Sequence, residues 1–99
     1  MTAAVENLEP LVEDVAKKFP NDIIRIRYHV GEDWSGDPGV FFRVLITDEA
    51  GSEPRFAEFV VRIGEELSQA WYSGHSDLFP YYRFRTKSEQ DRMQDPAWE

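Results

Sequence analysis

The chain has 99 residues, enough for one domain, and its 41% hydrophobic and 30% charged residues are typical of a globular protein. It contains no cysteine, which excludes a disulfide framework, thiolate metal sites and cysteine catalysis. The formal net charge of −8 argues against nonspecific binding to nucleic acid or anionic lipid. The sequence has no apolar run of membrane-spanning length and no signal-peptide pattern at its start, so we expect a cytoplasmic location.

Two segments repeat apolar residues at helical spacing. In residues 5–19 the offsets of three and four predict an amphipathic helix that Asn7 caps and Pro20 ends. Residues 54–71 show the same pattern over a longer stretch and predict a second helix. Gly64 is a weak helix former within this second helix, and we expect it to allow close packing against a sheet.

Three segments alternate apolar and polar residues and are predicted to be strands: 23–30, 40–47 and 79–86. In the first strand, Ile24, Ile26 and Val30 are expected to face the core and Ile23 to lie at its margin. Pro80 indicates that the third strand lies at an edge of the sheet. A capping box that begins at Ser88 predicts one further turn of helix.

The predicted order is α-β-β-α-β, an α+β fold with a single domain over residues 1–99. The glycine-rich loop between the first two strands indicates a hairpin, and we expect a three-stranded, mostly antiparallel sheet. Because each strand has one apolar face, both helices are expected to cover one face of that sheet. Residues 1–4 and 94–99 are expected to be mobile unless Trp98 docks onto the domain.

The open face of this sheet is the first candidate site. Strand alternation directs five of the eight arginines to it, together with His29, Phe41 and Tyr81; the arginines are Arg25, Arg27, Arg43, Arg83 and Arg85. Three explanations stay open. The arginines can be ordinary solvated residues paired with carboxylates, a docking surface for an acidic protein or a second copy, or a site for single-stranded RNA or a phosphorylated ligand.

The loop at residues 31–39 is the second candidate site. Its carboxylates Asp33 and Asp37 do not have the spacing of a calcium loop, so we predict turn chemistry and no metal site. Trp34 can either pack back onto the domain or serve as an exposed anchor for a partner. The glycines, the proline and the neighbouring acids favour the exposed position.

Residues 73–77, Ser-Gly-His-Ser-Asp, contain the residue types of a hydrolase triad. Adjacent residues rarely reach triad geometry, and the Gly-x-Ser-x-Gly elbow is absent from the sequence. Gly74 is more simply the residue that ends the second helix, with His75 near its C-terminus. The sequence also lacks phosphate-binding and dinucleotide-binding motifs, so we expect no catalysis, no cofactor and no metal.

Residues 31–38, Gly-Glu-Asp-Trp-Ser-Gly-Asp-Pro, precede a Phe-Phe-Arg strand at residues 41–43. With the Tyr-Arg-Phe-Arg segment at 82–85 and the closing Pro-Ala-Trp at 96–98, the chain resembles a group of short, acidic, uncharacterised bacterial proteins. The resemblance covers most of the chain and implies an association with toxin–antitoxin systems. It implies no particular activity.

These observations predict a small acidic protein-binding module, such as an antitoxin-like or accessory subunit of a protein complex. The net charge of −8 favours encounter with a basic, toxin-like partner. The residues expected to bind it are Asp33, Trp34, Asp37 and Trp98. The alternative function is binding of single-stranded RNA or a phosphorylated ligand by the arginines and Phe41 on the open face.

Overall fold

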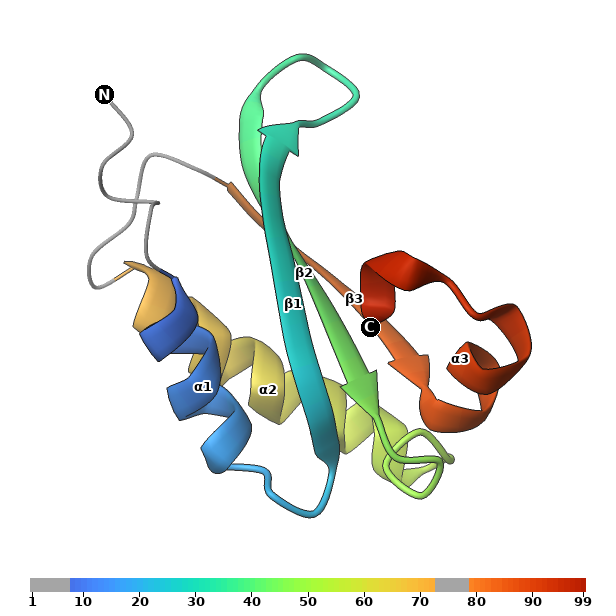
Figure 1. The fold of residues 1–99 in the computed structure, drawn as a ribbon. Coiled ribbons are helices and arrows are strands. Elements are labelled where there is room, and N and C mark those ends of the chain that lie inside the picture. Colours follow the sequence, from blue (N-terminus) through green and yellow to red (C-terminus); the bar gives the residue numbers. More distant parts are fainter. Residues whose placement is uncertain (1–7, 73–78) are drawn as a thin grey trace.

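A computed structural model describes residues 8–72 and 79–99 of the chain. Its elements are α1 (Glu9–Lys17), β1 (Ile23–Glu32), β2 (Pro38–Ile46), α2 (Arg55–Tyr72), β3 (Phe79–Thr86), α3 (Lys87–Met93) and the short 3₁₀ helix η2 (Pro96–Trp98) (Figure 1). The fold is of the predicted α+β class. It differs from the predicted order in the direction of one strand and in α3, which spans seven residues where one further turn of helix was predicted.

The sheet is mixed, with the order β1-β2-β3. β1 and β2 form the predicted antiparallel hairpin, but β2 and β3 are parallel, so the prediction of a mostly antiparallel sheet is wrong. The reason is α2, which carries the chain back along the sheet before β3 begins and therefore gives β3 the direction of β2. β3 lies at an edge, as Pro80 indicated.

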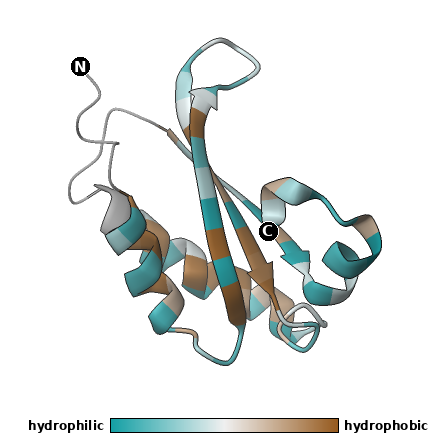
Figure 2. Cartoon of the chain, viewed as in Figure 1, coloured by the Kyte–Doolittle hydropathy of each residue, from teal (hydrophilic) through white to brown (hydrophobic). Residues whose placement is uncertain are grey.

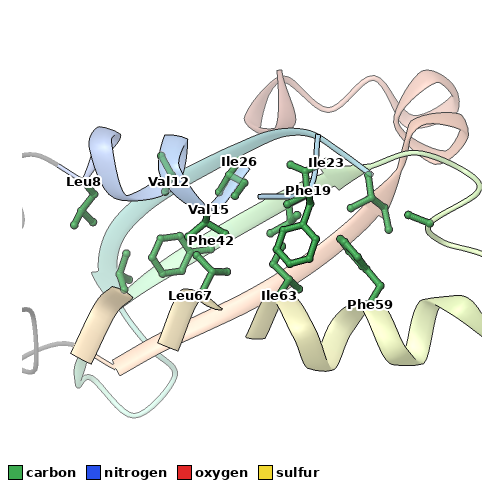
Figure 3. Close-up of a cluster of buried hydrophobic side chains, with 14 residues drawn as sticks. Leu8, Val12, Val15, Phe19, Ile23, Ile26, Phe42, Phe59, Ile63 and Leu67 are labelled. Carbon is green, nitrogen blue, oxygen red and sulfur yellow. The ribbon is translucent and has the colours of Figure 1, made fainter. Parts of the chain in front are cut away.

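Both long helices cover the same face of the sheet, and the core lies between these helices and the sheet (Figures 1 and 3). The four alternate residues of β2 that face the helices are fully buried: Val40, Phe42, Val44 and Ile46. Figure 2 shows β2 as mostly hydrophobic and α3 as mostly hydrophilic. Phe19 and Phe59 close one end of the core edge to face, with ring centroids 5.6 Å apart.

The start of β1 departs from simple alternation because the register shifts between Ile23 and Arg25. This irregularity turns Ile23 into the core, where it is 8% exposed, and leaves Ile24 38% exposed. The prediction that Ile24 faces the core is therefore wrong. Val30, also predicted to face the core, is 43% exposed, although its partner in the register, Val40, is fully buried.

Two local expectations are also wrong. A Cβ at Gly64 would meet no atom of the described residues within 4 Å, so this glycine is not a close-packing position. The residue that caps α3 is Thr86, whose hydroxyl accepts from the N–H of Glu89 at 3.2 Å, and not Ser88. The predicted cap at Asn7 and the predicted helix end at Gly74 and His75 lie outside the described residues.

Candidate functional site

The face of the sheet opposite to the helices brings the predicted site residues together in register. Three rows cross it, which we call the aromatic row (His29, Phe41, Tyr81), the arginine row (Arg27, Arg43, Arg83) and the tail row (Arg25, Leu45, Arg85). Successive rows lie two residues apart along each strand, or roughly 7 Å. All five predicted arginines and Phe41 therefore belong to one face, as the alternation predicted.

The rings of the aromatic row stack on one another across the three strands. Phe41 lies between His29, at a centroid distance of 4.9 Å, and Tyr81, at 5.0 Å, with interplanar angles of 14° and 12°. Both faces of the Phe41 ring are thus covered by neighbouring rings. The row presents ring edges to the outside, which makes it an apolar ridge and not a platform for stacking.

Trp34 stands at the rim of this ridge. Its side chain is 87% exposed, and it touches Tyr81 edge to face at 5.8 Å. Phe79 packs on Tyr81 in the same manner at 4.9 Å and is itself 57% exposed. The exposed position that the loop composition favoured for Trp34 is therefore the observed one, and the rim is a contiguous exposed aromatic patch.

Asp33 fixes the loop that carries Trp34. Its Oδ1 accepts from the backbone N–H of Ser35 at 2.9 Å and of Asp37 at 3.0 Å. Its Oδ2 accepts from the hydroxyl of Tyr81 at 2.7 Å, which ties the loop to β3. The hydroxyl of Ser35 also donates to Oδ1 of Asp33, at 2.7 Å, and this bond, followed by that of Tyr81, contributes most to lowering the pKa of Asp33 to about 2. Asp33 thus positions Trp34, while Asp37 remains exposed next to it.

The arginine row lacks the carboxylate partners that an ordinary solvated surface would supply. Within residues 8–72 and 79–99, no ion pair involves Arg43 or Arg83. Arg43 donates instead to Nδ1 of His29 at 2.9 Å. Partial burial and this nearby guanidinium lower the pKa of His29, which keeps the ring neutral and able to accept. Like charges in register across strands repel one another, so this row stands ready for an external anion.

The tail row is covered by the C-terminal segment, which lies on the side of the sheet away from α1 and α2 (Figure 1). Trp98 is 3% exposed, and the guanidinium of Arg85 lies 4.3 Å from the centre of its ring. Leu45 is 2% exposed although it belongs to the open face. Trp98 therefore docks onto its own domain and is not an exposed anchor for a partner. Arg25 and Arg85 are both half-buried.

A concavity of about 570 Å³ lies where the turn after β2 meets the beginning of α3. Its carboxylates already have hydrogen-bond partners. Asp48 accepts from the N–H and hydroxyl of Ser88, and Glu89 accepts from the N–H of Thr86 at 2.8 Å. Sequence reasoning missed this feature because it depends on contacts between segments about 40 residues apart. Its carboxylates cap and join segments of the fold.

The Ser-His-Asp segment at 73–77 lies outside the described residues. In the described ranges, no group of three or more histidine and carboxylate side chains could hold a metal ion. None of the helices described here is both long enough and apolar enough to cross a membrane. No protein-family model matches the chain, and no curated protein or solved structure is significantly similar to it. The resemblance to short acidic bacterial proteins therefore stays a prediction.

Proposed function

We propose that the protein is a binding module that docks another protein on the open face of its sheet. The observation that carries the proposal is the 87% exposure of Trp34 beside the aromatic ridge. Exposed aromatic patches of this kind are costly to leave in water, and tryptophan is enriched among the residues that dominate binding energy. The loop held by Asp33 presents Trp34 in one fixed orientation, which reduces the entropy lost on docking.

Charge supports the same proposal both during the approach of a partner and at the contact surface. The net charge of −8 would speed the approach of a basic protein, as expected for an antitoxin-like subunit. At contact, Arg43 and Arg83 would pair with local carboxylates of that partner and fix its orientation. The proposal includes no catalytic step. We expect the purified protein to turn over no ester, phosphate or RNA substrate.

The alternative function is binding of single-stranded RNA or a phosphorylated ligand. The in-register arginines favour it, because cations in a row suit a phosphate backbone. The stacked rings weigh against RNA, since both faces of Phe41 are already covered and bases bind by stacking on ring faces. Titration of a labelled oligonucleotide distinguishes the two functions. Phosphate binding would show a steep loss of affinity with salt, and no binding at low salt would exclude RNA.

The proposed function is tested by affinity capture from the native host with the tagged full chain. We expect one protein recovered in stoichiometric amount by the wild type and lost with Trp34→Ala. The matched control is Val61→Ala, because Val61 is 60% exposed on α2, away from the open face. Absence of a stoichiometric partner, or equal recovery by Trp34→Ala, would contradict the proposal.

A further inference from the structure

We infer that the partner meets the open face with an acidic segment that carries an aromatic side chain. This inference rests on the proposed function, because it concerns the same surface, and it names the chemistry of what docks there. The segment would place carboxylates on Arg43 and Arg83. Its aromatic side chain would lie against the aromatic row and Trp34.

The face already holds one segment of this chemistry, which is the chain's own C-terminus. The carboxylate of Asp95 lies 3.7 Å from Nη1 of Arg85, and the ring of Trp98 lies beneath the same guanidinium. Nε of Arg27 donates to the main-chain oxygen of Glu99 at 2.6 Å. An acidic segment with a tryptophan therefore fits the arginines of this face, with a carboxylate, a main-chain oxygen and an indole each contacting a guanidinium.

The neighbouring rows of the open face carry the same kinds of side chains that hold this segment, which are arginines next to apolar groups. In the arginine row, Arg27 on β1 is hydrogen-bonded to the C-terminal segment, and Arg43 and Arg83 lie in the same row on β2 and β3. Phe41 and Tyr81 lie in the row on the other side of Arg43 and Arg83. They provide apolar surface next to these arginines, as Leu45 does in the tail row. A second acidic aromatic segment would thus find the same pairing of guanidinium and apolar surface next to the first one.

The chemistry of the site favours a carboxylate-bearing peptide over a polynucleotide. A guanidinium matches the two oxygens of a carboxylate, and side chains alternate along an extended peptide at the spacing of the rows. Trp34 offers an indole that is exposed on most of its surface, so the aromatic side chain of the partner can pack on it. An acidic protein surface without an aromatic residue would leave this patch in water.

The inference is tested with fluorescently labelled synthetic hexapeptides and the purified full chain. The probe is Asp-Glu-Trp-Ala-Glu-Asp, and the controls replace its acids by the corresponding amides or its tryptophan by alanine. We expect saturable binding of the probe with a Kd below about 1 mM and much weaker binding of both controls. The double variant Arg43→Gln/Arg83→Gln should bind the probe about tenfold more weakly. The control Lys17→Gln/Arg92→Gln removes the same two charges from exposed positions on α1 and α3 and should leave binding unchanged.

Failure of this inference can be told apart from failure of the proposed function. If the probe does not bind, or binds no better than its amide control, the inference of an acidic segment is wrong, while capture that depends on Trp34 would still support protein docking. If sedimentation of the chain alone shows a dimer that Trp34→Ala abolishes, the occupant is a second copy and the inference is overturned. Tighter binding of an oligonucleotide at the same arginines would overturn it in favour of RNA.

Discussion

A single carboxylate, Asp33, joins the loop after β1 to the edge strand β3. Tyr81 donates to this carboxylate, and the same hydrogen bond raises the pKa of the Tyr81 hydroxyl, because an ionised tyrosine would lose the bond and face a negative charge. The acid pair Asp33 and Asp37 predicted turn chemistry correctly. The bond to Tyr81 was not predictable, since it joins residues 48 positions apart.

Asp33→Asn should lower the pKa of Tyr81 toward its ordinary value. The amide still accepts from the loop N–H groups but carries no charge, so ionisation of Tyr81 becomes easier. Spectrophotometric titration of the tyrosines of the variant and the wild type measures the change. Asp37→Asn is the control and should give a smaller decrease, because Asp37 acts on Tyr81 only through its charge. An unchanged tyrosine titration in Asp33→Asn would refute this role.

Truncation of the loop tryptophan and of the C-terminal tryptophan should have different effects on the stability of the domain. Trp34→Ala should leave the melting temperature nearly unchanged, because the side chain is 87% exposed. Trp98→Ala should destabilise the domain by about 3–5 kcal/mol, since it removes a buried ring and uncovers Leu45. Thermal scans of both variants measure this contrast, and Trp98→Ala should melt more than about 10 °C lower. Similar melting temperatures for the two variants would contradict the docked position of Trp98.

At the scale of elements, the alternation of apolar and polar residues predicted the strands and the face on which each side chain lies. Alternation in 40–47 and 79–86 predicted both strands, except for the exact ends of β2, and both faces, because side chains of a strand alternate whatever its partner is. The parallel pairing of β3 and the irregularity at Ile24 depend on how α2 and β2 pack, which the residues of either strand alone do not encode. The order strand, helix, strand did contain a usable signal for a parallel crossover.

Substitution of two glycines tests how closely neighbouring elements pack. Gly51 lies in the turn after β2, where a Cβ would overlap Cγ2 of Thr86, the residue that caps α3. Gly51→Ala should therefore destabilise the fold by about 1–3 kcal/mol. Gly64→Ala is the matched control inside α2, where the added methyl group meets open space among the described residues, and it should stabilise by about 0.5–1 kcal/mol. Urea denaturation measures both, and two shifts of the same sign would contradict this packing.

At the scale of the whole molecule, the two sides of the one sheet carry different kinds of side chains. One side is a continuous apolar core under α1 and α2, and the other combines arginines, a ridge of rings and the docked C-terminus. The sequence predicted which residues share the open face. It could not predict that the C-terminal segment covers the tail row, because that requires contacts from Trp98 and Glu99 to strands far back in the chain.

The acid stability of the whole protein should reflect its hydrogen-bonded carboxylates. Hydrogen bonds lower the pKa of Asp33 to about 2 and also lower the pKa values of Asp48 and Glu89. Groups with a lowered pKa in the folded state stabilise it fully above their unfolded pKa, near 4, and lose that contribution as the pH falls through the folded pKa. Between about pH 4 and pH 2 the unfolded chain then binds more protons, so stability should decrease with acid.

Urea denaturation from pH 7 to pH 2 measures this decrease as a lower denaturation midpoint. Between pH 7 and pH 5 we expect little loss, because protonation also relieves repulsion within a chain of net charge −8. Asp48→Asn removes one of the titrating groups, so its midpoint should fall less steeply below pH 4 than that of the wild type. A wild-type midpoint at pH 2.5 equal to or above that at pH 5 would show that the hydrogen bonds of these carboxylates do not stabilise the fold.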